Sequence, residues 1–200
     1  MIGVGAVTWA LVGVATVFGL VAVVLVAAWL TGRLTLDLGW GRSVHPLGPI
    51  SVHIDAPRSV VYDVIAGPYL GTPPHELREE LEVLERGRDF VVAAHHTKLS
   101  RFTSTTVEAV GFREPEMISF RLLRGVAPLV NERFELHDEG DATRLDYTGE
   151  LAMDFWAVGR LAGRHLVKPT WERVVARHVD EVKAAAEERA RGPHAKRSAG

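Results

Sequence analysis

The stretch ISVHIDAPRSVVYDVIAGPYL, residues 50–70, places a short strand directly before a helix. Apolar and polar residues alternate over residues 50–54, which is the period-two pattern of a strand with one buried face. Pro57 then stands where a first helical turn often begins, and apolar residues follow at helical spacing. We therefore expect a strand over residues 50–54 and a helix that ends at the Gly67-Pro68 pair.

Downstream of residues 69–80, which we interpret as a loop or broken helix, the sequence changes to a repeated strand pattern. Six segments are rich in alternating or β-branched residues and are separated by tight turns. They read EELEVLERG, DFVVAAHHTK, RFTSTTVEAVGF, MISFRLLRG, LVNERFELHDEG and TRLDYTGELAM. Six consecutive strands with short connections predict an antiparallel meander.

The last long segment, residues 155–192, has helical periodicity and predicts one long helix, or two helices joined near Pro169. Gly159 and Gly163 are small positions that we expect to allow a close approach of this helix to the sheet. The residues that share the predicted inner face of the helix are Val167, Trp171, Val174, His178 and Val182.

The N-terminal segment is different, because residues 1–32 contain no charged side chain. The apolar run exceeds the ~20 residues that cross a bilayer as a helix, and Trp9 and Trp29 lie near its ends, where the headgroup region favours them. A cleaved signal peptide is the alternative, but such peptides have a basic start and a shorter apolar core. We expect a single-pass membrane anchor through residues 2–31.

The charge around this anchor gives a prediction of its orientation. Arg33 and Arg42 follow the span and no basic residue precedes it, so the positive-inside rule places the C-terminal domain in the cytoplasm.

The chain has a net charge of −2, which gives no basic excess for a nucleic-acid partner, and it has no cysteine.

The order of strand, helix, six strands and long helix predicts an α+β fold. An antiparallel sheet must cover its apolar face, and the C-terminal helix is the available cover. We expect a curved antiparallel sheet of about seven strands wrapped around that helix, preceded by one transmembrane helix, with a cavity between helix and sheet.

Three stretches add a resemblance to this layout. ISVHIDAPRSVVYDVIAGP, VEAVGFREPEMISFRL and FELHDEGDATRLDYTGEL resemble the opening, the middle and the last hairpin of START-like domains, the helix-grip superfamily also called SRPBCC. The polyketide cyclase/dehydrase-like branch is the nearest in pattern. The resemblance covers residues 50–190 and implies a fold that holds lipids, sterols or polyketides in most members and catalyses a reaction in a minority.

The candidate site residues follow from the period of the last hairpin and of the helix. Glu132 is a carboxylate on an otherwise apolar inward face, so its pKa is expected to rise and it is a candidate acid or base. Tyr147 and His178 are the other weak catalytic candidates. The residues expected to line the ligand site are Val130, Glu132, Phe134, Tyr147, Trp171, Val174 and His178.

Other patterns argue against cofactor chemistry. His95 and His96 are adjacent on a predicted strand and therefore face opposite sides, so they do not chelate one metal, and we expect no metal and no cofactor. Ordinary structural roles remain open for all the polar candidates: Glu132 solvated or paired at a cavity mouth, and His178 a satisfied interior group.

The sequence thus predicts four parts: an anchor over residues 1–32, a juxtamembrane linker over 33–49, a START-like domain over 50–190 and a basic flexible tail over 191–200. Trp40 in the linker is expected at the membrane interface, and the tail is a candidate for contact with anionic headgroups. Three functions remain open, namely binding of a hydrophobic small molecule or lipid, a cyclase/dehydratase-like enzyme, and a structural module with a filled core.

Overall fold

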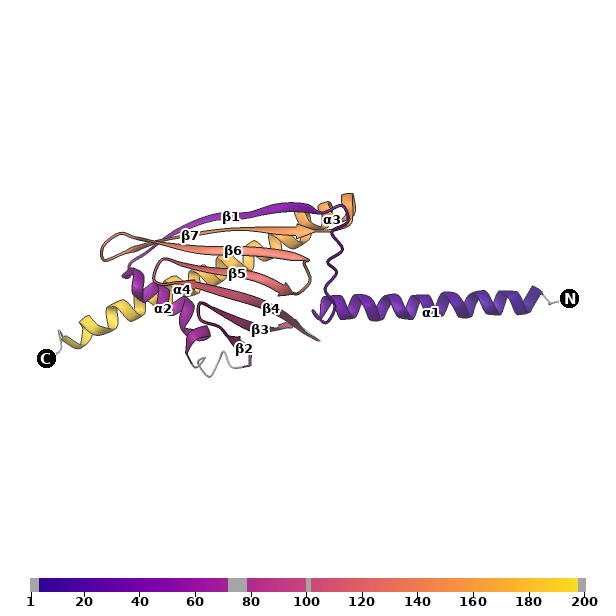
Figure 1. Ribbon diagram of the computed structural model, residues 1–200, viewed down its shortest axis with the longest axis horizontal. Helices are drawn as coiled ribbons and strands as arrows, with labels where there is room; N and C mark the ends of the chain where they lie inside the picture. The colour runs from indigo at the N-terminus through magenta and orange to yellow at the C-terminus, as the bar shows by residue number, and fades with distance from the viewer. Residues whose placement is uncertain (1–3, 72–78, 100–101, 198–200) are drawn as a thin grey trace.

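The computed structural model describes residues 4–71, 79–99 and 102–197, and it separates a long helix from a layered domain (Figure 1). The described residues therefore omit residues 72–78, where part of the predicted loop or broken helix lies. The elements in chain order are α1 (Val4–Leu30), β1 (Ser43–Ile54), α2 (Arg58–Leu70), β2 (Leu81–Arg86), β3 (Phe90–Leu99), β4 (Phe102–Arg113), β5 (Met117–Arg124), β6 (Leu129–Asp138), β7 (Thr143–Met153), α3 (Trp156–Ala162), the π-helical segment η2 (Gly163–Val167) and α4 (Lys168–Arg197).

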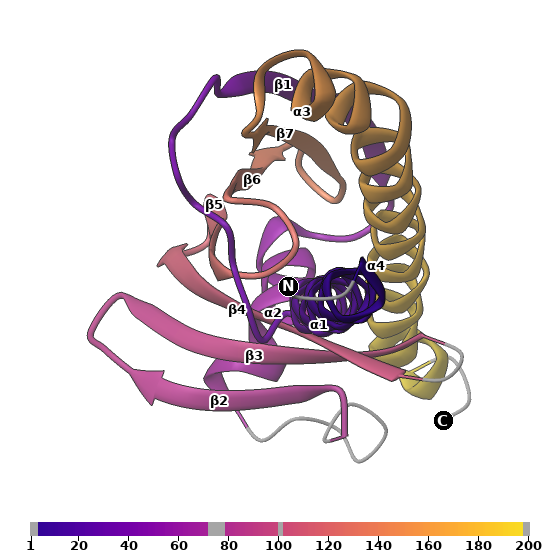
Figure 2. The ribbon, with the colours of Figure 1, turned by 90° about the vertical axis from the view of Figure 1, so that its right-hand side faces the viewer.

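The domain is built on one seven-stranded sheet in the order β1-β7-β6-β5-β4-β3-β2, with every neighbouring pair antiparallel. Strands β2 to β7 form the predicted meander, and β1 joins the free edge of β7. The sheet curves around α4, with α2 beside it (Figure 2). The predicted helix-grip architecture of a curved antiparallel sheet, a long C-terminal helix and an N-terminal apolar helix is thus confirmed.

Strand β1 begins at Ser43, well before the strand predicted from residues 50–54, and so takes up part of the predicted linker. Pro46 and the Gly48-Pro49 pair made this region look like a linker. Because β1 is an edge strand, Pro46 can sit opposite Glu150 without removing a hydrogen bond from the sheet interior. The register shifts between Leu47 and Ile50, at the Gly48-Pro49 pair.

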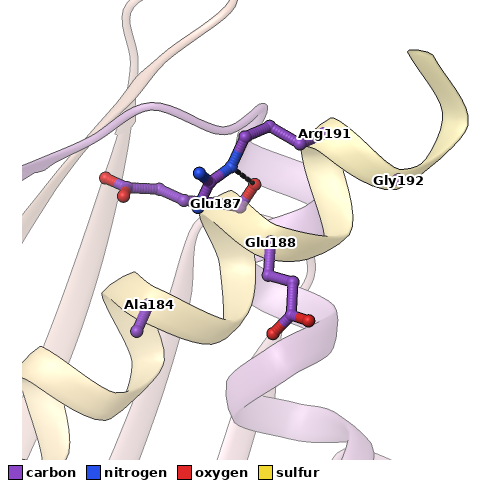
Figure 3. A pocket seen from close by; sticks show the side chains of 5 residues that line it. All are labelled: Ala184, Glu187, Glu188, Arg191 and Gly192. Carbon is purple, nitrogen blue, oxygen red and sulfur yellow. Dashed lines mark hydrogen bonds between the residues drawn. The ribbon is translucent and has the colours of Figure 1, made fainter. Parts of the chain in front are cut away.

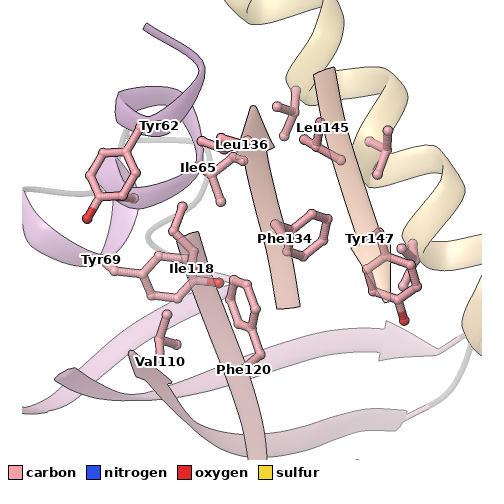
Figure 4. Close-up of a cluster of buried hydrophobic side chains, with 14 of the residues drawn as sticks. Tyr62, Ile65, Tyr69, Val110, Ile118, Phe120, Phe134, Leu136, Leu145 and Tyr147 are labelled. Carbon is pink, nitrogen blue, oxygen red and sulfur yellow. The ribbon is translucent and has the colours of Figure 1, made fainter. Parts of the chain in front are cut away.

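The core lies between the inner face of the sheet, α2 and the middle of α4 (Figure 4). From β5, β6 and β7, alternate residues point inward and are buried, as the period-two pattern predicts. From α4 the buried residues are Val175, Val179, Val182 and Ala186.

Two helix boundaries differ from the sequence prediction. Helix α2 continues past Pro68 to Leu70 and closes with a bond from the Gly71 N–H to the Gly67 carbonyl. Helix α4 continues from α3 through η2 without a break, so Pro169 lies within one helical run, directly after the π-helical turn of residues 163–167. The helix runs to Arg197, so the first part of the predicted flexible tail has a helical backbone.

Residues 31–42, between α1 and β1, form a strap that is bonded to the domain along its length. The Thr31 carbonyl accepts from the Thr105 N–H at 3.1 Å, and Thr35 Oγ1 exchanges hydrogen bonds with the Gly125 backbone. Gly32, at φ +68°, lies so close to β4 that a Cβ would sit 1.9 Å from the Thr105 carbonyl oxygen. At the end of α1, Trp29 donates to the Val126 carbonyl at 2.9 Å. The base of α1 is therefore fixed against the domain.

A buried carboxylate fixes the other end of the strap. Asp154, just after β7, accepts from Arg42 Nε at 2.8 Å and from the backbone N–H groups of Leu38 and Gly39 at 2.8 and 2.9 Å. Its side chain is 1% exposed. Asp37 pairs with the outer side of the same guanidinium. The sequence pattern did not predict this ion pair between Arg42 and Asp154.

Candidate functional site

Glu132 is the polar centre of the inner face. It points inward from β6, and its Oε1 accepts two hydrogen bonds, one from the Tyr147 hydroxyl at 2.5 Å and one from Trp171 Nε1 at 2.7 Å. Tyr147 comes from the neighbouring strand β7 and Trp171 from the first turns of α4. Among the described residues no donor contacts Oε2, and this oxygen is not buried. The carboxyl group is thus fixed through Oε1, and Oε2 remains available to a ligand.

Burial controls the protonation of this group. Desolvation raises the pKa of Glu132, although the bonds from Tyr147 and Trp171 stabilise the charged form and oppose the rise. Desolvation, followed by the nearby Glu132 charge, raises the pKa of Tyr147 far above its usual value, so this hydroxyl stays a proton donor at neutral pH. The pair combines a carboxyl group of elevated basicity with a fixed O–H donor.

Aromatic rings form a continuous row beside Glu132. Successive ring centroids lie 5.8, 5.6 and 5.2 Å apart from Tyr69 through Phe120 and Phe134 to Tyr147. Val130 and Phe134, two predicted lining residues, are buried in this face. Such spacings are those of favourable edge and tilted aromatic packing, so this part of the inner face is apolar and rigid.

His178 lies next to this row but keeps contact with solvent. Its ring centroid is 6.3 Å from that of Phe134, and yet the residue is exposed. Protein surrounds it closely enough that desolvation lowers the pKa of His178 below its usual value, which keeps it neutral at pH 7. The imidazole of His178 is therefore accessible at the edge of the inner face, close to Phe134.

The prediction that Val174 lines the site is wrong, because this residue is 61% exposed on the outer side of α4. The buried stripe passes through Val175 and Val179 instead. The inner face of α4 is therefore shifted by about one residue along the sequence from the predicted face. His178 then falls at the edge of this stripe, which explains its exposure.

A second polar group on the inner face was missed. His95 Nε2 is 2.5 Å from Glu108 Oε1 and 3.2 Å from the Tyr69 hydroxyl, so strands β3 and β4 and helix α2 supply a tyrosine, a histidine and a carboxylate that meet. His96 faces the other side and contacts Thr105 Oγ1 at 3.1 Å, as the alternation predicts. The aromatic row links this second group to Glu132.

Two surface hollows differ in their relation to these groups. One, of about 620 Å³, is lined by residues of α4 near its C-terminal end (Figure 3); the lining residues are Ala184, Glu187, Glu188, Arg191 and Gly192. The other, of about 680 Å³, is lined mainly by outward-facing residues of β5, β6 and β7, such as Arg133 and Glu135, but Phe120 and Glu132 also line it. The second hollow reaches Glu132 but not its partners Tyr147 and Trp171, which lie on the inner face, so we place the candidate site on the inner face.

The groups around Glu132 can bind and polarise a polar group of a ligand, and Glu132 can exchange a proton with it. Oε2 of Glu132 can accept from a hydroxyl or amine, and when protonated the carboxyl group can donate. Among residues 4–71, 79–99 and 102–197, no group of three or more histidine or carboxylate side chains is arranged to hold a metal ion. The chemistry available is therefore hydrogen bonding, apolar contact and acid–base exchange.

No family model and no curated protein matches the sequence. Solved structures do match in fold. A protein from Thermus thermophilus superposes with a TM-score of 0.53 and 19% identity, over 73% of this chain and 97% of that chain. Norcoclaurine synthase from Thalictrum flavum, in complex with dopamine and hydroxybenzaldehyde, gives 0.54 and 13% identity, over 79% and 91% of the two chains.

A third similar structure has two domains. The di-domain ARO/CYC from the steffimycin biosynthetic pathway gives a TM-score of 0.54 and 13% identity, over 75% of this chain and 51% of that chain. At these identities the likeness shows the fold alone. The chain has the helix-grip fold of SRPBCC proteins, a fold that hosts both enzymes and binding proteins.

Proposed function

We propose that this chain is a membrane-tethered helix-grip protein that binds a small, largely apolar molecule between the inner face of the sheet and α4. The observation that carries the proposal is the half-satisfied carboxyl group of Glu132, fixed by Tyr147 and Trp171 within an aromatic wall. Such a wall with one convergent polar group is the usual composition of a small-molecule site.

The position of the polar groups defines the class of molecule. A ligand that lies along the aromatic row and carries a hydroxyl or amine would direct that group to Oε2 of Glu132. A second polar group at the far end of the ligand would meet the pair of His95 and Glu108. The ligand is therefore an apolar molecule with one or two polar ends, rather than a fully apolar one.

Helix α1 supports the membrane part of the proposal. Residues Leu11–Trp29 are long and apolar enough to cross a membrane, and none of that window is buried within the protein. Its large apolar side chains face outward all round, which fits a lipid environment. In this arrangement α1 keeps the domain at a bilayer that both stores and supplies apolar molecules. The location of the domain on the cytoplasmic side stays a prediction from Arg33 and Arg42.

Native mass spectrometry of the full-length protein, released from detergent micelles, tests the binding function. We expect a fraction of the wild-type protein to carry a small-molecule adduct, and we expect Glu132→Gln to lose most of that fraction. The matched control is Glu135→Gln, three residues further along β6 on the outer face, which should keep the adduct.

Two outcomes would count against the proposal. The first is an adduct that Glu132→Gln and Glu135→Gln retain equally, which would place the ligand away from the inner face. The second is an adduct-free wild-type protein that also fails to take up a fatty alcohol or an aromatic phenol added in excess. The second result would favour a structural module with a filled core.

The raised pKa of Glu132 favours one further candidate, an acid–base enzyme of the cyclase/dehydratase type. In that case Glu132 would take a proton from a carbon next to a ketone, and the Tyr147 hydroxyl would hydrogen-bond the oxygen on which charge develops. Incubation with a short polyketide thioester mimic should then give a dehydrated, cyclised product by mass spectrometry. Product from the wild type and none from Glu132→Gln would establish the enzyme; unchanged substrate with both proteins leaves the binding function.

A further inference from the structure

The segment that follows β7 exposes an unusual number of large apolar side chains. Helix α3 and η2 together form a short helical arm between Asp154 and the start of α4. On this arm Val158 is 74% exposed and Leu166 is 67% exposed. We call the exposed set the α3 apolar face; its members are Phe155, Trp156, Val158, Leu161 and Leu166.

The apolar face points outward because glycines take the inward positions of the arm. A Cβ at Gly159 would lie 1.5 Å from the Asp154 carbonyl oxygen, and a Cβ at Gly163 would lie 2.6 Å from His45 Nε2. Gly163 therefore approaches strands β1 and β7, as predicted, whereas Gly159 approaches the backbone of Asp154 just after β7. A surface helix normally turns its large apolar residues toward the core, whereas this arm turns its smallest residues there and exposes the large ones.

The arm lies at the end of the domain from which α1 leaves. Figure 1 shows α3 and the C-terminal end of α1 at the same end, and Figure 2 looks onto that end. The strap fixes the arm: the Phe155 N–H donates to the Trp40 carbonyl at 2.7 Å, and the Trp156 N–H donates to the Gly41 carbonyl at 3.0 Å. Trp40 is itself 61% exposed. The α3 apolar face and α1 therefore have a fixed position relative to each other.

The charge on the arm has one sign. Arg160, Arg164 and His165 are exposed among the apolar residues, and the sequence holds no acidic residue between Asp154 and Glu172. Exposed aromatic and aliphatic side chains interleaved with arginines are the composition of helices that lie in the headgroup layer of anionic membranes. A partner surface that is apolar and negatively charged matches both properties.

We propose that the α3 apolar face docks into the headgroup layer of the same bilayer that α1 spans, with Arg160 and Arg164 contacting anionic lipid phosphates. The inference rests on the proposed membrane tether. It adds a second point of contact, one that sets the tilt of the domain and brings the start of α4, with Trp171, toward the lipid.

Site-directed fluorescence tests this docking, and the absence of cysteine from the chain makes single labelling direct. Val158→Cys carries an environment-sensitive nitrobenzoxadiazole probe in the full-length protein, reconstituted at low density in vesicles of phosphatidylcholine and phosphatidylglycerol. The matched control is Leu84→Cys on β2, also an exposed apolar position but on the opposite part of the domain. A third protein, Leu20→Cys, reports the middle of α1.

We expect the probe at position 158 to shift to shorter wavelength, to lose access to aqueous iodide and to be quenched by lipids with a spin label near the headgroup. The probe at position 84 should stay accessible to iodide. Arg160→Glu combined with Arg164→Glu should reverse the shift at position 158. A probe at 158 that is as accessible as the one at 84 would overturn the docking.

Two other outcomes would also overturn the inference, and each has its own signature. If the probe at position 20 is not quenched by deeply placed spin labels, the membrane tether itself fails. If the probe at 20 is in lipid but the probe at 158 is shielded from iodide without quenching by spin-labelled lipid, then protein covers the face, as in contact with a second copy of the chain.

Discussion

Replacement of Asp154 by alanine should release the strap from the domain. The side chain of Asp154 is 1% exposed and joins three partners: Arg42, whose Nε lies 2.8 Å from Oδ1, and the backbone N–H groups of Leu38 and Gly39, which both donate to Oδ2. Alanine removes all of these bonds at once; it leaves the two backbone N–H groups without an acceptor and leaves the guanidinium only its contact with Asp37.

The magnitude follows from the burial of the pair. Removal of one partner from a buried ion pair costs ~3–5 kcal/mol. The Arg42 side chain is 28% exposed and keeps its contact with Asp37, so water and that carboxylate compensate part of the remaining charge. We expect the free energy of unfolding to fall by about 2–3 kcal/mol, which for a chain of this size lowers Tm by roughly 4–12 °C.

The pH dependence of this contribution has a defined sign. The bond from Arg42, above all, lowers the pKa of Asp154 from its usual 3.8, so the native state favours the charged form. A carboxyl group with a lowered native pKa stabilises the fold above its unfolded pKa and loses this contribution as the pH falls through the native pKa. The difference between wild type and Asp154→Ala should be constant from pH 5 to 8 and shrink below about pH 4.

Thermal unfolding of the full-length protein in detergent, followed by near-ultraviolet circular dichroism, measures the first effect. Hydrogen exchange of residues 37–41 measures the second, since the amides of Leu38 and Gly39 should lose protection. Asp141→Ala, in the exposed turn between β6 and β7, is the control and should change neither quantity. Wild-type Tm together with wild-type protection in Asp154→Ala would refute the role of this carboxylate.

Three further predictions concern the inner face and the packing of the helices. Burial raises the pKa of Glu132 in the native state, so the protonated carboxyl group stabilises the fold at low pH and this contribution is lost as the pH rises from 4.5 through the native pKa. The Tm of the wild type should therefore fall relative to that of Glu132→Gln over this range. Parallel pH profiles of Tm for the two proteins would contradict the prediction. Val179→Ala removes two buried methyl groups at ~0.8 kcal/mol each and leaves a cavity, so we expect the free energy of unfolding to fall by about 2 kcal/mol. The exposed Val174→Ala should lower it by less than about 0.5 kcal/mol. Equal effects of the two substitutions in chemical unfolding would mean that Val174 is as buried as Val179. Gly159→Ala places a Cβ 1.5 Å from a backbone oxygen and should cost about 1–3 kcal/mol in the same experiment, whereas Gly13→Ala meets no atom within 4 Å and should be neutral.

The periodic parts of the fold could be predicted from the sequence. The six strands of the meander alternate over enough residues that their inward faces, including Glu132 and Tyr147, follow directly from a period of two. The start of β1 could not be predicted, because proline and glycine carry the signal of a linker unless the strand is known to lie at a sheet edge.

The rest of the site depended on contacts between distant segments. His95 and Glu108 meet because β3 and β4 pair with His95 opposite Thr106, a register that no local pattern specifies. The rotation of α4 was missed for a related reason. Val174 and Val175 are equally apolar neighbours, and only the surface that the helix packs against decides which of the two is buried.

The strap gives the domain a mechanical property that a loose connection lacks. A flexible linker over residues 31–42 would let its ends separate by about 20 Å on average, and the domain could sample many heights and orientations. Here hydrogen bonds at Thr31, Thr35 and Asp154 remove that freedom. If α1 rotates about its own axis, the whole sheet therefore rotates with it by the same angle. A partner that binds α1 within the bilayer would therefore change the orientation of the domain without contacting the domain itself.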